Sequence, residues 1–405
     1  MTNTLPLADV KILDLMWVMA GPAGTRVLAD YGATLVRVES AKRIDTARTL
    51  QPFHNRKPGP DSSALYQNLN TGKLGLSLDL NNEQARDVVR DLVRWADVVT
   101  ESFSPRAMKM WGLDYESLRK IKPDIIMISS CLMGQTGPMA KFAGFGNLAA
   151  AISGFFNLTG WPDRPPAGPF SAYTDYVAPR FTALSILAAL DHRRRTGQGQ
   201  YIDQSQAEAT LHFLTPVLLD YTVNGRVQGA TGNRDPHLAP HGVYPAAGTD
   251  RWVAIVVQTE EQWQSLCEVM QRPYLLHDER FATRDARLAY QDELDAQVST
   301  WTKTLDPFRI EALLQARGVS AGAVSTTYEV YKDPQFTHRE HFVQLEHPTY
   351  GHTTVEGSRF RLSRTPAQIE RCAPTLGRDN QYVLETILGY SEEKISELAV
   401  AGALE

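Results

Sequence analysis

The first half of the chain alternates short apolar runs with longer segments of helical periodicity. Val10 to Leu15 is an apolar run, Gly21-Pro22 opens a helical segment that lasts to about Asp30, and Thr34 to Val38 is a second apolar run. Two apolar runs of strand length joined by an amphipathic helix predict a βαβ unit. We therefore expect a parallel sheet to begin in residues 10–38.

The same alternation continues along the chain. Residues 74–80 resemble a strand, Asn81-Asn82 offers a helix cap, and the apolar positions between Ala85 and Ala96 share one helical face. After Pro123, residues 124–130 are almost continuously apolar, which is typical of a strand covered on both sides. These patterns predict an α/β protein whose large domain is Rossmann-like.

The pattern changes from about Val227. Residues 243–245 and 251–257 read as two strands joined through Gly248-Thr-Asp250, which predicts a hairpin, and residues 319–324 read as a further short strand. We expect the N-terminal part of the large domain in residues 1–226 and a smaller α+β domain in residues 227–330. Residues 331–405 form a separate C-terminal segment.

One long helix is predicted directly after Asp175. Apolar residues recur at helical spacing from Phe181 to Leu190, Pro179 lies in the first turn, and three arginines followed by Gly197 mark the far end. Asp175 therefore lies at or just before a helix N-terminus. An aspartate in that position most simply caps the helix, because its carboxylate accepts bonds from unpaired N–H groups.

Composition excludes several classes of protein but does not identify the function. The 405 residues are 43% hydrophobic and 21% charged, with a net charge of −5 spread along the chain. This argues against a nucleic-acid surface and a polybasic membrane patch. No apolar run reaches the ~18 residues of a membrane span, and no signal peptide is recognisable, so we expect a cytoplasmic protein. The cysteines and histidines lack ligand spacing, and no metal site is predicted.

Seven short motifs occur in one order between about residues 5 and 365. They are Leu13-Asp-Leu, Ala20-Gly-Pro22, Tyr31 to Glu39, Asn70-Thr-Gly-Lys73, Gly112-Leu-Asp-Tyr115, Gly134-Gln-Thr-Gly-Pro138 and Arg193 to Gln200. Taken together the chain resembles the class III CoA-transferase family of formyl-CoA and carnitine CoA-transferase type, to which α-methylacyl-CoA racemases are related. The resemblance implies that residues 331–405 return to the large domain. It also implies a homodimer whose subunits are threaded like linked rings, although a homologous second subunit is an alternative.

The resemblance also makes Asp175 the catalytic nucleophile. A carboxylate that attacks an acyl-CoA thioester forms a mixed anhydride, and the released thiolate then converts the enzyme carboxyl to an aspartyl-CoA thioester. A second acid reverses these steps. The implied function is transfer of CoA from an acyl-CoA donor, such as succinyl-CoA, to a dicarboxylic or arylalkanoic acid. CoA enters as a substrate, and no permanently bound cofactor is expected.

The family's CoA-contacting positions fall on several segments of this sequence. The resemblance assigns CoA contacts to Met19, Ala20, Leu69, Asn70, Lys73, Ser102, Phe103, Arg106, Lys109 and Lys141. Arg48 either faces the carboxylate of the acid or pairs with Asp45. The glycine run that formyl-CoA transferases place over the site is replaced here by residues 230–235, which weakens an oxalate or formate assignment.

Three other functions fit parts of the sequence. A racemase needs a His-Asp pair, but Phe145 and Gly146 stand at those positions, and a phenyl ring carries no proton. A nicotinamide dehydrogenase would explain Glu39 after the second strand, but residues 20–24 are not the phosphate-binding turn and Pro22 removes an amide donor. The third is a non-catalytic subunit of a mixed assembly, and the presence of Asp175 argues against it.

Overall fold

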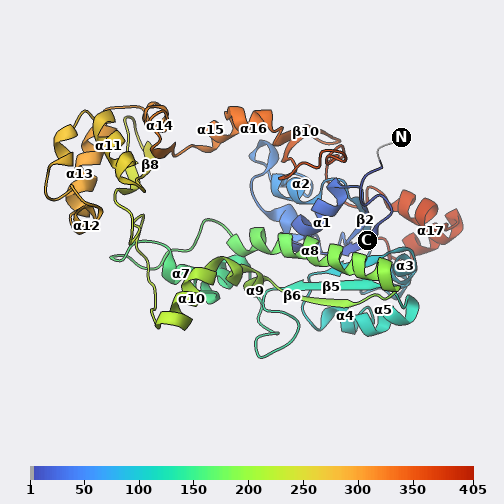
Figure 1. The fold of residues 1–405 in the computed structure, drawn as a ribbon. Coiled ribbons are helices and arrows are strands. Elements are labelled where there is room, and N and C mark those ends of the chain that lie inside the picture. Colours follow the sequence, from blue (N-terminus) through green and yellow to red (C-terminus); the bar gives the residue numbers. More distant parts are fainter. Residues whose placement is uncertain (1–3) are drawn as a thin grey trace. The chain divides into compact units, whose positions relative to one another are not determined.

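The computed structural model describes residues 4–405, which form two compact units (Figure 1). The first unit contains the residues up to 156 together with 168–227 and 335–405. The second contains residues 157–167 and 228–334. The sequence pattern placed the boundaries near residues 227 and 330 and did not separate residues 157–167 from the first unit.

A six-stranded parallel sheet forms the centre of the first unit. Its order is β3-β2-β1-β4-β5-β6, so the direction of strand addition reverses between β1 and β4. The strands are β1 (Lys11–Leu15), β2 (Thr34–Glu39), β3 (Leu74–Ser77), β4 (Val98–Glu101), β5 (Ile126–Cys131) and β6 (Tyr201–Ser205). The expected α/β architecture with a parallel sheet is confirmed, whereas β6 was not anticipated.

Helices cover both faces of this sheet. Successive strand residues point to opposite sides, and apolar residues occupy both sides. Ile12 packs in one apolar cluster with residues of α1 (Ala20–Asp30) and α8 (Tyr173–Thr196). Its neighbour Leu13 packs in another cluster with α3 (Glu83–Trp95), α5 (Tyr115–Ile121) and α17 (Glu392–Val400). Burial on both faces explains why these strands read as continuous apolar runs in the sequence.

Helices α1 and α8 lie side by side on their face of the sheet (Figure 1). A Cβ atom on Gly24 of α1 would lie 2.8 Å from Cβ of Thr182 on α8, so glycine permits the close approach. Helix α8 ends where Gly197 takes a left-handed φ of 75°. This packing holds the N-terminal turn of α8 beside the carboxyl ends of the strands (Figure 1).

The C-terminal segment belongs to the first unit. Strands β10 (Phe342–His347) and β11 (Gly351–Glu356) pair antiparallel, and the backbone N–H of Gly75 on β3 donates to the Asp379 carboxylate at 2.7 Å. The other helices of the first unit are α2 (Ala64–Asn70), α4 (Ala107–Met110), α6 (Gly146–Ile152), α9 (Gln206–Leu211), α10 (Thr215–Asn224) and the π-helical segment Tyr382–Ile387. Two helices, α7 (Phe155–Leu158) and α16 (Pro334–His338), contain residues of both units.

The second unit is a small α+β domain. Strands β7 (His241–Pro245), β8 (Trp252–Val256) and β9 (Ser320–Ala323) form an antiparallel sheet, which includes the expected hairpin. Its helices are α11 (Glu260–Val269), α12 (Arg284–Ala289), α13 (Gln291–Thr302), α14 (Pro307–Gln315) and α15 (Thr327–Lys332). Trp263 and Phe281 are buried in its separate apolar core.

Candidate active site

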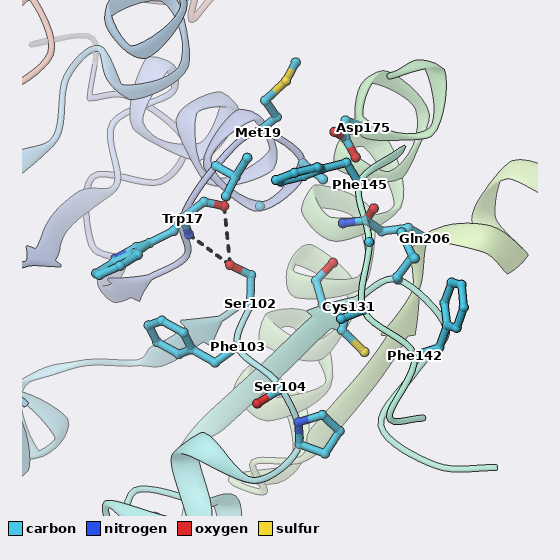
Figure 2. A pocket seen from close by; sticks show the side chains of 18 of the residues that line it. Trp17, Met19, Ser102, Phe103, Ser104, Cys131, Phe142, Phe145, Asp175 and Gln206 are labelled. Atoms are coloured by element: carbon cyan, nitrogen blue, oxygen red, sulfur yellow. Dashed lines mark hydrogen bonds between the residues drawn. The ribbon is translucent and has the colours of Figure 1, made fainter. Parts of the chain in front are cut away.

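A cavity of about 200 Å³ lies at the carboxyl ends of the central strands (Figure 2). Its lining comes largely from residues at or just beyond the strand ends: 17–21 after β1, 102–105 after β4, 130–132 at the end of β5 and Gln206 after β6. In doubly wound sheets ligands bind where the strand order reverses. The cavity therefore occupies the expected ligand position, between β1 and β4.

Asp175 is the carboxylate of this cavity. It is the third residue of α8, its exposed fraction is 6%, and its side chain lies beside Phe145 (Figure 2). Ala172 is the N-cap of α8, and the helix has no side-chain capping bond. The interpretation of Asp175 as a helix cap is therefore wrong, because its carboxylate is not used to close its own helix.

The environment of Asp175 combines burial with little compensation. Burial raises the pKa of the carboxyl to about 6, and a hydrogen bond donated by the backbone N–H of Gly146 opposes that rise. No cation among residues 4–405 contributes to this shift. At pH 7 such a group is about nine-tenths ionised yet poorly solvated. This state suits a nucleophile, because the anion has lost much of its stabilising shell.

Gly146 lets its own backbone reach the carboxylate. A Cβ atom at this position would lie 2.7 Å from Oδ1 of Asp175 and 2.7 Å from Oγ1 of Thr174. The Thr174 hydroxyl donates to the carbonyl oxygen of Gly146 at 3.2 Å, which ties α8 to the start of α6. Any side chain at position 146 would displace the Asp175 carboxylate.

An aromatic wall faces the ends of β1 and β4. The hydroxyl of Ser102 accepts the backbone N–H of Trp17 at 2.9 Å, which joins the two loops (Figure 2). The ring of Phe103 packs edge to face against Trp17 at 5.4 Å and against Trp111 at 5.3 Å between ring centroids. Ser102 and Phe103 were expected here, whereas Trp17 was missed although it follows a strand directly.

The predicted cations divide into two groups. Lys141 is exposed and lines the cavity. Arg106, the N-cap of α4, and Lys109, within α4, are also exposed. Within residues 4–405 none of these three forms an ion pair. Met19 and Ala20 also line the cavity and are buried. These positions are compatible with the CoA contacts that the sequence assigned to them.

Lys73 lies in a buried polar network instead of the cavity lining. Its ammonium group lies 2.9 Å from the Asp14 carboxylate and donates to Thr25 Oγ1 at 2.8 Å and Asn70 Oδ1 at 3.0 Å. Burial lowers the pKa of Lys73 to about 8, and the Asp14 charge opposes that fall. Leu69 and Asn70, the last residues of α2, are buried as well, and neither lines the cavity.

Arg48 is buried in an extension of this network. Its guanidinium pairs with Glu39 at 2.7 Å and Asp61 at 2.8 Å, and Asp45 pairs with Arg37 instead. The predicted Arg48–Asp45 pair is therefore wrong. Arg48 is also absent from the residues that line the cavity.

Sequence reasoning missed two groups at the carboxyl end of β5 and beyond β6. Gln206 lines the cavity, and the strand that positions it was not recognised. Cys131 lines it as well, but burial, followed by the charge of Asp203, raises the pKa of this thiol to about 11. A thiol with so high a pKa is protonated at neutral pH, so Cys131 is a weak nucleophile there.

Comparisons with known proteins find relatives that match nearly the whole chain. The chain is 33% identical over 393 residues to a succinyl-CoA–D-citramalate CoA-transferase from Chloroflexus aurantiacus, covering 97% of this chain and 96% of the relative. It is 34% identical over 383 residues to a succinate–glutarate CoA-transferase from Agrobacterium fabrum, covering 94% and 95%. The crystal structure of a CaiB/BaiF family protein from Brucella suis superimposes with a TM-score of 0.88 and 31% identity, covering 95% of this chain and 100% of that one.

The model of CoA-transferase family III matches residues 7–380, which is nearly the whole chain. The assignment drawn from seven short motifs is thereby confirmed, as is the enzyme class it implied. Among the helices of residues 4–405 none has the length and apolar character that a bilayer crossing requires. The chain belongs to CoA-transferase family III.

Proposed function

We propose that this enzyme moves CoA from succinyl-CoA to a dicarboxylic acid through a covalent aspartyl-CoA intermediate on Asp175. One observation carries the proposal: a buried carboxylate without a cationic partner lies in the cavity at the strand-order reversal. Residues with only structural roles rarely leave a buried charge so poorly compensated.

The reaction proceeds through four displacements. The Asp175 carboxylate attacks the thioester carbonyl, the C–S bond breaks, and a mixed anhydride and CoA thiolate result. The thiolate attacks the anhydride at the aspartyl carbonyl, which forms the aspartyl-CoA thioester and releases succinate. The acceptor carboxylate attacks this thioester, and the thiolate then attacks the new anhydride at the acceptor carbonyl. These steps restore Asp175 and need no general base or resident cofactor.

The surroundings of Asp175 stabilise the negative charge that develops in each step. The Gly146 N–H already points at the carboxylate, and the first turn of α8 contributes the positive end of its dipole. Groups fixed in this way before the reaction stabilise tetrahedral oxyanions without reorganising. Phe145 lines the same cavity and carries no proton, which disfavours the racemase alternative.

The open ends of the cavity suit the two halves of CoA. We assign the exposed cations Arg106, Lys109 and Lys141 to the phosphates, because ionised donors bind phosphate oxygens strongly. Phe103 and Trp17 present aromatic surface for the adenine or the pantetheine arm. The choice of succinyl-CoA and a dicarboxylic acceptor rests on the names of the relatives from Chloroflexus and Agrobacterium.

We further propose an interlocked homodimer located in the cytoplasm. Helix α10 has no buried residue and exposes Leu219, Tyr221 and Val223, while Leu184 of α8 is 62% exposed. Apolar surface of this kind is typical of an interface. The three free cysteines suit a reducing compartment. Linked subunits cannot separate while folded, so the dimer should persist at nanomolar concentration; a folded monomer there, or activity that requires a homologous second chain, would contradict the homodimer.

A mass measurement tests the covalent step. The wild-type protein is incubated with succinyl-CoA, digested, and the peptide that contains Asp175 is weighed. It should gain the mass of CoA less water, and hydroxylamine should remove the addition. Asp175→Asn, which keeps the shape of the side chain, should acquire no addition. An adduct on another peptide, or an unmodified wild-type protein that still transfers CoA, would refute the proposal.

A further inference from the structure

Ser130 carries a buried hydroxyl of the cavity that the fold does not use. It lies near the carboxyl end of β5, its exposed fraction is 1%, and it lines the same cavity as Asp175. Within residues 4–405 its Oγ atom has no hydrogen-bond partner. A buried hydroxyl without a partner costs free energy, and a ligand oxygen that bonds to it removes that cost.

The side chain of Ser130 faces the helix that carries Asp175. Side chains alternate along a strand, so Ser130 points to the same face of the sheet as Ile128, which packs in the apolar cluster that contains residues of α8. On β6 the residue in register with Ser130 is Gln204. Its carboxamide donates to the carbonyl oxygen of Ala178, one turn after Asp175 in α8, at 3.1 Å. Ser130 therefore lies on the face that the first turns of α8 cover.

The acids at this edge of the sheet lie on the opposite face. Ser129 is in register with Glu101 on β4 and with Asp203 on β6, and its hydroxyl bonds to Glu101. Because Ser129 directly precedes Ser130, these acids point away from the side of Ser130, and neither lines the cavity. The Oε1 atom of Gln204 is unpaired as well, but Gln204 does not line the cavity. A ligand in the cavity therefore meets the Ser130 hydroxyl but none of these acceptors.

Other side-chain donors of the lining are engaged or reached by solvent. The Trp17 indole donates to the carbonyl oxygen of Val38 at 3.1 Å. The Ser102 hydroxyl accepts the backbone N–H of Trp17 at 2.9 Å and donates to its carbonyl oxygen at 3.4 Å. Ser104 is exposed and Gln206 is half-buried, so water can bond to both. Ser130 differs from them because it is both buried and unpaired.

We propose that the Ser130 hydroxyl is a catalytic hydrogen-bond donor, which stabilises the oxyanion that forms at the substrate carbonyl when Asp175 attacks. The inference rests on the proposed function and adds a residue to it. As the new C–O bond forms, the π electrons of the carbonyl move to its oxygen, which has lone pairs but no proton. The hydroxyl donates to this oxygen and keeps its own proton, and the carbonyl re-forms when the C–S bond breaks. The Gly146 N–H is already bonded to the attacking carboxylate, so the substrate oxygen needs a further donor.

Ser130→Ala tests this role, because it removes the hydroxyl and little else. With succinyl-CoA as donor and glutarate as acceptor, kcat should fall about 100-fold, whereas KM for succinyl-CoA should stay within about threefold. Ser130→Thr keeps a hydroxyl and should recover most of the rate. The pH dependence of kcat/KM in Ser130→Ala should match the wild type, because Ser130 does not contribute to the pKa of Asp175.

Ser77→Ala is the matched control. Ser77 ends β3 in the same sheet, its buried hydroxyl also has no partner within residues 4–405, and it does not line the cavity. Each variant loses an unpaired hydroxyl, so both should resist urea at least as well as the wild type, and Ser77→Ala should keep the wild-type kcat.

Three results would overturn the donor role: a wild-type kcat in Ser130→Ala, a raised KM with kcat unchanged, or equal losses of kcat in Ser130→Ala and Ser77→Ala. In each case a CoA adduct on Asp175 of the wild-type protein would still uphold the proposed function. Absence of that adduct would overturn both.

Discussion

Two buried aspartates of the first unit have opposite surroundings. Asp14 on β1 is fully buried, and it meets the Lys73 ammonium group at 2.9 Å and the hydroxyls of Thr25 and Thr100 at 2.9 Å each. Asp175 is almost as buried, and the Gly146 N–H is the group that compensates it. Their acid strength follows the difference. Burial would raise the pKa of Asp14, but Lys73 and Arg37 hold it below its usual range, whereas the pKa of Asp175 rises to about 6.

The contrast separates a structural carboxylate from the carboxylate that we propose as the nucleophile. Asp14 is saturated with donors, so an attack on an electrophile would first have to break these bonds. Asp175 has one donor and a cavity in front of it. Burial alone therefore does not identify a nucleophile, but burial without compensation does so more strongly.

Removing the reactive carboxylate should have the largest effect. Asp175→Asn should lower the CoA-transfer rate by at least ~10⁴-fold, because the aspartyl thioester cannot form. The far-ultraviolet circular dichroism spectrum and the affinity for free CoA, measured by calorimetry, should match the wild type. A variant that keeps a substantial share of the rate would place the nucleophile elsewhere.

Breaking the saturated network should instead destabilise the fold. Lys73→Met leaves Asp14 buried without its cation, and it should lower the free energy of unfolding by about 3–5 kcal/mol. Urea denaturation measures this. Adding Asp14→Asn to Lys73→Met removes the stranded charge and should recover part of the loss. Equal stability of the single variant and the wild type would show that Asp14 does not need its partner.

The two aspartates should also differ in how stability depends on pH. The pKa of Asp175 is about 6 in the folded protein and about 3.9 when unfolded, so the folded state binds its proton more tightly. As pH rises from 4 to 6, the unfolded state ionises first and stability is lost, up to about 3 kcal/mol. Above pH 6 the penalty stays constant. Asp175→Asn should therefore be more stable than the wild type at pH 8 and equal to it near pH 4.

Asp14 has the opposite sign. Its folded pKa lies below its usual value, so its pairing stabilises the protein at neutral pH and that contribution is lost in acid. Comparing Asp175→Asn with the double variant Asp14→Asn, Lys73→Met from about pH 2 to pH 8 separates the two contributions, because that of Asp14 is lost only below its unfolded pKa of about 3.9. A pH-independent difference between Asp175→Asn and the wild type would mean that Asp175 keeps an ordinary pKa.

A smaller change should disturb the nucleophile without removing it. Gly146→Ala places a Cβ atom 2.7 Å from Oδ1 of Asp175, so the carboxylate must move. We expect kcat to fall about 10- to 30-fold, since misplaced groups lose transition-state alignment. Gly137→Ala is a control in open space, although its left-handed φ of 88° adds backbone strain. A wild-type kcat in Gly146→Ala would show that the carboxylate tolerates displacement.

The sequence predicted the sheet, its helices and Asp175 because apolar periodicity and short motifs are local. The strands around Ile12 and Ile128 and the helix cap at Asn82 lie where expected. Strand β6 was not predicted because residues 201–205 are partly polar, and Gln206 directly after it was therefore not recognised. The sequence also could not predict that Lys73 is buried whereas Lys141 is exposed. Both are lysines beside turn residues, and only the tertiary contacts of α1 and α2 bury the first.

Of these two lysines, Lys141 is the one whose replacement should have the smallest effect of all the variants. Lys73 has its donors occupied by Asp14, Thr25 and Asn70, whereas Lys141 is exposed at the cavity and pairs with no acid among residues 4–405. Lys141→Ala should raise KM for the acyl-CoA about 3- to 10-fold with a smaller change in kcat, because phosphate binding is equal in ground and transition states. Added salt should shrink the difference. Lys120→Ala, an exposed control on α5, should change neither constant. An unchanged KM in Lys141→Ala would show that Lys141 does not bind phosphate and would leave that role to Arg106 and Lys109.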